Sequence, residues 1–276
     1  MPDAVDGPKR KSPRLGVARA RIQTGSSHDP FEALGLHETP DKRREISVFL
    51  PPAESVTLDG VGRMKRIPGS DCFVFELQET DTLEQHYRLT WKEKHSGEIH
   101  HEVSPYSFDS QIGELDLHLF REGRHQHAWK FLGARQHCVD GVEGCQFAVW
   151  APGVRRVSVV GDFNHWDGRR HPMRCLGDSG IWELFIPDLQ PGEAYKYELR
   201  TSHGKILIKT DPYARRMALR PETTSIIPED TDWAWADGDW MQARTRFDWQ
   251  HQPCLLYTSD AADEGVEGGG AGGGGG

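Results

Sequence analysis

The chain has 276 residues, of which 36% are hydrophobic and 27% are charged, a balance typical of a globular protein with room for two modest domains. Its net charge of −9 argues against a general nucleic-acid binder, and no apolar run approaches the roughly 20 residues that a membrane span requires. The first residues lack the apolar core of a secretory signal, so we expect a cytoplasmic location.

The cysteines are odd in number and irregularly spaced, and none forms a CxxC pair. This pattern favours reduced thiols over a disulfide framework or a zinc site, and we expect neither a metal nor a cofactor. The five residues are Cys72, Cys138, Cys145, Cys175 and Cys254.

Residues 1–27 are basic and lack hydrophobic periodicity, so we expect a disordered, solvated extension rather than a nucleic-acid or targeting arm. Residues 28–112 contain short β-type runs about ten residues apart, after a short helix or turn entered through Asp29 and Pro30. This spacing predicts an antiparallel β-sandwich. The runs are REISVFL (44–50), SVTL (55–58), CFVFEL (72–77) and HYRLTW (86–91).

The pattern then repeats at offsets of 100 to 110 residues. VFLPPAESVTL (48–58) matches VWAPGVRRVSVV (149–160), and HYRLTW (86–91) and SPYSF (104–108) match KYELR and DPYAR. Matching order with a drifting offset predicts a second copy of the sandwich at residues 137–228, beyond a connector at 113–136 that contains a helix.

Residues 229–253 lead away from the second sandwich and contain Trp233, Trp235 and Trp240. These tryptophans could form a sugar platform. We favour the interpretation that they pack a linker against a neighbouring domain. Residues 254–276 begin with CLLYTSDAADE, which resembles a translated sequencing adapter, and end in a glycine run. We interpret this tail as an artefact.

The densest polar and aromatic segment is GDFNHWDGRRHPM (161–173), which lies between two predicted strands. A turn of this composition displays side chains. It also opens a long ordered series with SGIWELFIP (179–187), YKYE (195–198) and KTDPYA (209–214). This series, with RPETTS (220–225) after it, resembles bacterial glycogen branching enzymes, the 1,4-α-glucan transferases of the α-amylase superfamily.

The resemblance covers about residues 28–250 and includes DPFEALGLH (29–37) and GELDLHLFREGRH (113–125) in the first half. It implies an all-β fold of two immunoglobulin-like antiparallel β-sandwiches in tandem. The second would be a family 48 carbohydrate-binding module. The family's catalytic (β/α)₈ barrel would follow near residue 246, and none of its catalytic motifs occurs in this sequence, so no catalytic residue is assigned.

The resemblance implies an α-glucan, such as glycogen or a maltooligosaccharide, as the ligand, and the missing barrel as an intramolecular partner. Glucan chains stack their C–H faces on aromatic rings and pair their hydroxyls with polar groups. Trp166 is the main predicted platform, although its turn could instead pack on the barrel. The other candidates are Asn164, Trp182, Lys196 and Tyr197, of which Trp182 alternates with core residues.

Other polar residues of the turn have simpler interpretations. Asp162 and Asp167 could suggest a catalytic pair, but a surface turn offers neither the cleft nor the altered pKa that retaining glycosyl transfer requires. His165 and His171 lack a second ligand at metal spacing. Arg169 and Arg170 could bridge to the barrel or remain a solvated pair, and Phe163 favours the core.

Two other functions remain open. A debranching enzyme or a trehalose-releasing hydrolase of the same superfamily carries a similar module. A glycogen-binding module without a barrel is the alternative outside the enzyme class.

Overall fold

The computed structural model describes residues 10–11, 15–39, 41–229, 234–248 and 250–251. The chain divides into two compact units, residues 1–230 and 231–276. In the second unit, the described residues form one helix, α3 (Gly238–Arg244), with exposed Trp235 and Trp240. The expectations for Trp233 and for residues 254–276 fall on positions outside the described residues.

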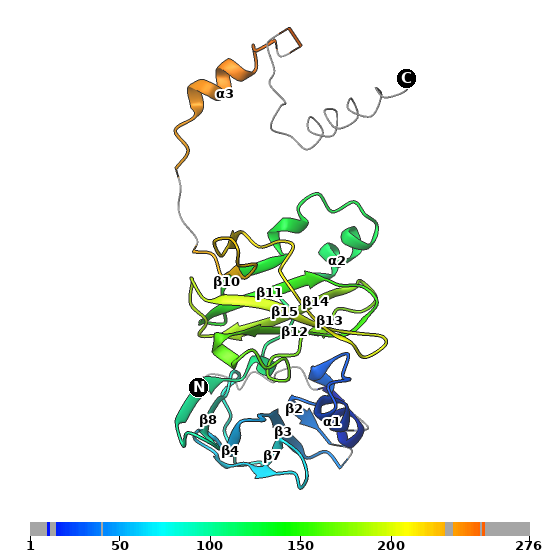
Figure 1. Cartoon of the computed structure of the whole chain (residues 1–276). Coiled ribbons are helices and arrows are strands. Elements are labelled where there is room, and N and C mark those ends of the chain that lie inside the picture. The colour runs from blue at the N-terminus through cyan, green and yellow to red at the C-terminus, as the bar shows by residue number, and fades with distance from the viewer. Residues whose placement is uncertain (1–9, 12–14, 40, 230–233, 249, 252–276) are drawn as a thin grey trace, which may run out of the picture. The chain divides into compact units, whose positions relative to one another are not determined.

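The first unit contains two sandwiches, coloured blue to cyan and green to yellow in Figure 1, in which every described strand pair is antiparallel except β1 with β2. In the first sandwich, β-branched and aromatic residues from both sheets, among them Ile46, Val56, Phe73 and Trp91, meet in one buried cluster. One sheet has the order β1 (Arg10–Lys11), β2 (Gly35–Glu38), β3 (Arg44–Phe49), β7 (Cys72–Leu77) and β6 (Lys65–Arg66). The other has the order β5 (Gly62–Arg63), β4 (Ala53–Leu58), β8 (Arg88–Glu93) and β9 (Ile99–Val103).

The second sandwich encloses a larger core that includes Phe147, Val157, Trp182 and Tyr195. One sheet has the order β10 (Gly133–Val139), β11 (Val142–Trp150), β14 (Ile181–Pro187) and β13 (Arg174–Cys175). The other has the order β12 (Val154–Gly161), β15 (Ala194–Thr201), β18 (Ser225–Ile226) and β17 (Arg216–Met217), with β16 (Ile206–Lys209) also paired to β15. The all-β fold of two sandwiches predicted from the sequence is confirmed.

The two sandwiches share one topology. Strands β2-β3-β7-β6 correspond to β10-β11-β14-β13, and β4-β8-β9 correspond to β12-β15-β16. The register also repeats, because Phe49 faces Cys72 across β3 and β7, as Trp150 faces Ile181 across β11 and β14. We call residues 10–107 the first copy and residues 114–226 the second copy.

One glycine in each copy shows how closely the two agree. Gly35 begins β2 with φ +95°, and Gly133 begins β10 with φ +96°. A Cβ atom would lie 2.6 Å from the carbonyl oxygen of Tyr106 at Gly35 and 2.8 Å from that of Tyr213 at Gly133. Both the left-handed backbone and the close approach therefore require glycine in both copies.

In each copy, a helix and a 3-10 turn come directly before the matching strands β2 and β10, which corrects one expectation. Helix α1 (Leu15–Gln23) buries Leu15, Ala18 and Ile22, so the prediction of disorder for residues 1–27 is wrong where the structure describes them from residue 15. The connector predicted at 113–136 contains the expected helix, α2 (Glu114–Arg121), followed by η3 (Ala128–Lys130), but β10 already begins inside it, at Gly133. The matching turn of the first copy, η1 (Pro30–Glu32), starts at Asp29 as expected, with the Asp29 carboxylate accepting a hydrogen bond from the Phe31 amide.

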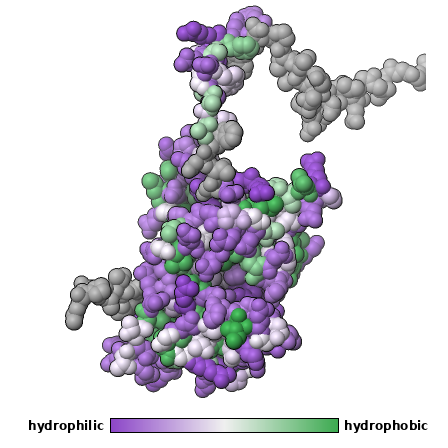
Figure 2. Space-filling model, turned by 90° about the vertical axis from the view of Figure 1, so that its left-hand side faces the viewer, coloured by the Kyte–Doolittle hydropathy of each residue, from purple (hydrophilic) through white to green (hydrophobic). Residues whose placement is uncertain are grey.

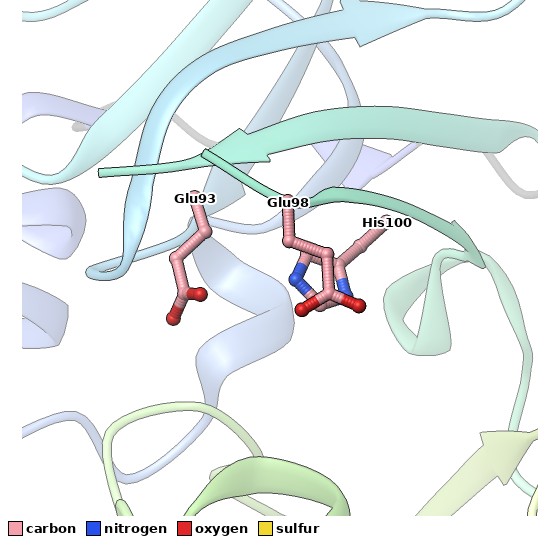
Figure 3. Close-up of side chains that lie close together, drawn as sticks. All are labelled: Glu93, Glu98 and His100. Atoms are coloured by element: carbon pink, nitrogen blue, oxygen red, sulfur yellow. The ribbon is translucent and has the colours of Figure 1, made fainter. Parts of the chain in front are cut away.

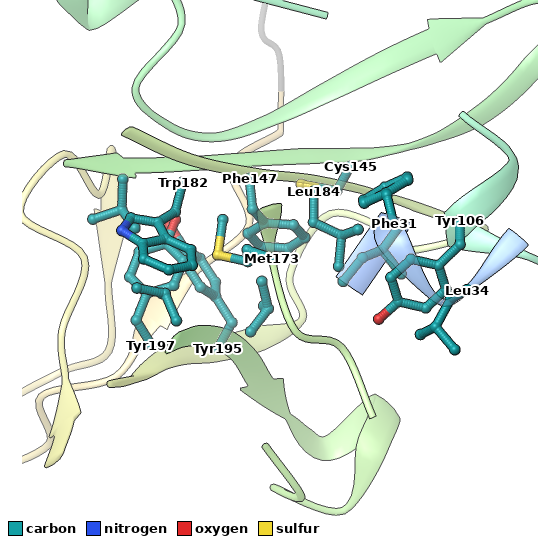
Figure 4. Close-up of a cluster of buried hydrophobic side chains, with 14 of the residues drawn as sticks. Phe31, Leu34, Tyr106, Cys145, Phe147, Met173, Trp182, Leu184, Tyr195 and Tyr197 are labelled. Atoms are coloured by element: carbon teal, nitrogen blue, oxygen red, sulfur yellow. The ribbon is translucent and has the colours of Figure 1, made fainter. Parts of the chain in front are cut away.

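The copies share a continuous buried cluster (Figure 4). Phe31 and Tyr106 of the first copy lie in the same cluster as Phe147 and Trp182 of the second. The Arg174 guanidinium of β13 lies 4.0 Å from the centre of the Phe31 ring. Apolar burial therefore joins the copies into one compact unit. The face drawn in Figure 2 is largely hydrophilic, with small separate hydrophobic patches.

Candidate functional site

The GDFNHW turn is built around Asn164, in the short turn η4 (Asp162–Asn164) that follows β12. Asn164 is 1% exposed. Its Oδ1 accepts a hydrogen bond from the Gly161 amide at 3.0 Å, and its Nδ2 lies 2.8 Å from the Val159 carbonyl and 2.9 Å from Nδ1 of His171. The prediction that Asn164 contacts sugar is therefore corrected, because its polar atoms already hold the turn together.

His171 is buried beside Asn164 as a neutral ring. Since the Asn164 amide nitrogen is a donor, Nδ1 of His171 accepts, and the ring proton is on Nε2. Burial, with the charge of Arg170 as the second cause, holds the pKa of His171 well below its ordinary value of 6.5. If Nδ1 of His171 were protonated, its N–H group would face the N–H donor of the Asn164 side chain.

Arg170 attaches the turn to the first copy. Its guanidinium lies 2.9 Å from the Glu102 carboxylate of β9 and 5.1 Å from the centre of the Trp91 ring of β8. The Tyr106 hydroxyl also donates to the Pro172 carbonyl at 3.3 Å. Arg170 thus forms an ion pair with Glu102 of the first copy. The sequence interpretations were a bridge to the barrel or a solvated arginine pair, and this arrangement differs from both.

The aspartates of the turn are occupied in structural contacts. Asp162 accepts a hydrogen bond of 2.8 Å from Nε1 of Trp166. Asp167 pairs with Arg169 at 2.6 Å, and, although burial acts to raise it, the hydrogen bonds from Arg169 hold the pKa of Asp167 below its usual value. The lowered pKa of Asp167 is the opposite of the raised pKa that a general acid needs.

Two further sugar candidates are core residues. Trp182 and Tyr197 are each 1% exposed. The Trp182 indole donates to the Ala151 carbonyl at 3.0 Å, and the Tyr197 hydroxyl donates to Asp211 at 3.4 Å. The prediction of sugar contact is corrected for Tyr197, because its ring is buried in the core. Trp182 borders the hollow described below, but only 1% of its surface is exposed, so it is not the predicted sugar platform.

Trp166 and Lys196 remain accessible. Trp166 is 36% exposed, with left-handed backbone at φ 58°. Lys196 is half-buried on β15, and its ammonium donates to Oγ1 of Thr223 at 3.0 Å. The structure does not bring these two side chains together with Asn164 into one pocket, so their sugar contacts stay predictions.

The second copy does contain a hollow suited to a ligand, with a volume of about 460 Å³. Its most exposed aromatic wall is Trp150 at the end of β11, which is 52% exposed. Phe120 of α2 meets Trp150 edge to face, with ring centres 6.1 Å apart. His28, Arg121, Asp178 and Ser179 add polar groups to the lining.

Gly180 leaves the space beside Trp150 open. Its φ is +72°, and a Cβ atom there would lie 3.2 Å from Nε1 of Trp150 and 3.2 Å from Cβ of Pro152. An exposed flat indole next to a hollow with a polar lining can stack on an apolar ligand face and hydrogen-bond its edges. This is the arrangement that a sugar ring requires.

The sequence interpretation overlooked Trp150. Residues 147 to 150 alternate along β11, so that Phe147 and Val149 face the large core while Ala148 and Trp150 face the other side. That alternation was visible in QFAVWAP (146–152). A tryptophan on the outward side, at the end of a strand, was the available signal for a surface platform.

The hairpin of β8 and β9 carries a different polar cluster (Figure 3). One ligand-type atom from each of Glu93, Glu98 and His100 lies within 4.8 Å of the others. Glu98 is exposed, and Glu93 accepts a hydrogen bond from Ser96. Exposed carboxylates of this kind are common without an ion, so their proximity alone does not indicate a metal centre.

None of the helices among the described residues is long and apolar enough to cross a membrane. Cys72, Cys138, Cys145 and Cys175 are free thiols.

Two family models match the chain in the order of its two copies. The model described as alpha-1,4-glucan branching enzyme GlgB, N-terminal domain, matches residues 18–106, and carbohydrate-binding module 48 (isoamylase N-terminal domain) matches residues 132–214. Each matched range lies within one of the two copies seen in the structure.

Curated relatives carry the name of one enzyme. The 1,4-alpha-glucan branching enzyme GlgB of Thiobacillus denitrificans is 60% identical over 237 residues, which is 86% of this chain and 32% of that protein. The GlgB protein of Methylococcus capsulatus is 48% identical, over 90% of this chain and 34% of its own length. The chain therefore spans about a third of the length of these relatives.

Solved structures give weaker matches. Pullulanase from Anoxybacillus sp. LM18-11 aligns over 68% of this chain and 26% of its own, with 15% identity and a TM-score of 0.31. A score in this range carries no weight for fold or function. The family models and the curated relatives together identify the chain as the amino-terminal region of a GlgB-type 1,4-alpha-glucan branching enzyme, a GlgB amino-terminal domain followed by a family 48 carbohydrate-binding module.

Proposed function

We propose that this chain is the glucan-binding and scaffold portion of an enzyme that forms α-1,6 branches in glycogen by transferring α-1,4-linked glucan segments. The relatives named as GlgB favour branching over debranching or trehalose release. The observation that supports glucan binding is the hollow beside Trp150, with its exposed indole and polar lining.

Binding and chemistry are separate in this proposal. Retaining glycosyl transfer needs two carboxyl groups about 5–5.5 Å apart across the scissile bond, in a cleft that removes water. The aspartates of the 161–173 turn are held in structural contacts. We therefore expect the purified 276-residue chain to leave the iodine colour of amylose unchanged, whereas measurable branching would contradict the proposal.

Trp150→Ala tests the binding site. Calorimetric titration with maltoheptaose should show an affinity at least about tenfold lower than that of the unchanged chain, because the stacking platform is lost. Trp166→Ala is the matched control, on an exposed tryptophan of the second copy that does not line the hollow, and we expect a smaller loss. Unchanged binding by Trp150→Ala would refute the assignment of this hollow.

The location also remains a proposal. Free thiols at positions such as Cys138, which is exposed, suit a reducing compartment. We infer a cytoplasmic location, which fractionation of the source cells with an antibody against the chain would test.

A further inference from the structure

A short segment of the first copy reaches the hollow of the second. Residues 24–29, which we call the strap, join helix α1 to the turn η1. Within the strap, His28 lines the hollow beside Trp150, together with residues of α2 and of the loop at 175–180. The amino-terminal domain therefore supplies part of the wall of a cavity whose other lining residues belong to the second copy.

The strap is fastened to the second copy at several points. Arg200 of β15 donates to the carbonyl oxygens of Thr24 and of Gly25, the latter at 2.8 Å. Gly25 has φ +63°, and a Cβ atom there would lie 2.3 Å from Nη1 of Arg156. The left-handed backbone favours glycine at this position, and the hydrogen bonds from Arg200 attach the strap to the second copy.

The contacts of His28 fix its orientation and its tautomer. Its ring meets Trp182 edge to face, with ring centres 4.8 Å apart. Its Nδ1 lies 3.2 Å from the carbonyl oxygen of Arg155. Since a carbonyl only accepts, Nδ1 carries the proton, and the neutral ring keeps Nε2 as a hydrogen-bond acceptor. His28 is exposed, so a ligand in the hollow can reach this nitrogen.

We propose that His28 is a glucan-binding residue, accepting a hydrogen bond at Nε2 from a sugar hydroxyl while the glucan stacks on Trp150. This inference rests on the proposed glucan binding at the hollow. It makes the site a composite one, built from both copies, and gives the GlgB amino-terminal domain a direct part in carbohydrate recognition. In this arrangement, the edge-to-face contact with the buried ring of Trp182 orients the His28 imidazole.

The test compares His28→Ala with His203→Ala, which removes an exposed histidine outside the hollow. Maltoheptaose titration of the full 276-residue chain should give an affinity about 3- to 10-fold lower for His28→Ala, as loss of one hydrogen bond predicts. His203→Ala should bind like the unchanged chain. His28→Gln, whose amide oxygen can accept near the position of Nε2, should recover part of the loss.

Trp150→Ala in the same series separates the two proposals. If Trp150→Ala loses binding and His28→Ala does not, the role of His28 is refuted while the hollow stands. If neither variant loses binding, the hollow itself is refuted. A second measurement does not depend on the folding of the His28→Ala variant. In nuclear magnetic resonance spectra of the unchanged chain, the imidazole carbon-proton signal of His28 should shift as maltoheptaose saturates the site. A signal that stays in place would overturn the inference.

Discussion

Phe49 and Trp150 occupy the same register position in the two copies of the sandwich, yet Phe49 is 3% exposed and Trp150 is 52% exposed. In the first copy, Phe49 belongs to the large buried cluster with Ala18 and Ile22 of helix α1. In the second copy, the corresponding helix α2 has no buried residue and leaves the hollow at its side.

The difference lies in how each preceding helix meets its sheet. At the end of α1, Oε1 of Gln23 accepts hydrogen bonds from the amide of Asp71 and the hydroxyl of Ser70, which closes the loop after β6 against the helix. In α2, Phe120 meets Trp150 only edge to face. One topology thus yields a closed interface in one copy and an open hollow in the other.

Phe49→Ala and Trp150→Ala should separate these roles most strongly. We expect Phe49→Ala to lower the free energy of unfolding by roughly 3–5 kcal/mol, because it opens a cavity in the shared core. Trp150→Ala should cost about 1 kcal/mol or less, since half of that side chain is already in water. Urea denaturation of both variants measures the difference, and equal losses would contradict the comparison.

Asn164→Ala should give the next largest effect. It removes the buried side chain that bonds the Gly161 amide and the Val159 carbonyl, in a turn that has no counterpart in the first copy. We expect the free energy of unfolding to fall by about 2–4 kcal/mol. Asp162→Ala, an exposed change in the same turn, is the control and should cost under about 1 kcal/mol. If the Asn164 variant were as stable as the control, the turn would not depend on this side chain.

The pH dependence of stability tests His171 in the same turn. Its pKa in the folded chain lies well below 6.5, so below about pH 6.5 the unfolded chain binds more protons than the folded one. Stability should therefore fall as the pH drops from 7 to 5, by up to about 1.4 kcal/mol per pH unit from this residue. His171→Gln should show a shallower slope in urea denaturation at a series of pH values. An unchanged slope would mean that His171 titrates normally.

Trp166→Ala should have the smallest effect. Its ring is partly exposed and its indole is held by Asp162, so the free energy of unfolding should change by less than about 1 kcal/mol. Thermal unfolding of the variant beside the unchanged chain measures this. A large loss would show that Trp166 packs against the fold.

The strands and their repeat were predictable because alternation and turn residues mark them locally, as CFVFEL shows at β7. Helix α1 was not predicted, although Leu15, Ala18 and Ile22 have helical spacing. The arginines between these residues make the segment polar on average, so its apolar face is hard to recognise in the sequence. Arg19 is satisfied by Glu45 and Ser47, residues of a strand that begins more than twenty positions later. Such partners exist only in the folded chain.

The site was predicted less well. The composition of the 161–173 turn correctly marked an unusual segment, but its polar groups face inward or toward the first copy, as Asn164 and Arg170 show. Local sequence does not reveal that a second domain lies against a turn. His28 shows the opposite case. It belongs to the first copy, and only the folded chain places it in the wall of the hollow beside Trp150.

We propose that the hollow beside Trp150 receives α-glucan. Nuclear magnetic resonance of the indole N–H groups of the 276-residue chain tests it directly, with Trp150→Phe and Trp166→Phe used to assign two of the signals. We predict that added maltoheptaose shifts the signal missing from Trp150→Phe more than that missing from Trp166→Phe. A Trp150 signal that stays in place at saturating maltoheptaose would contradict the account.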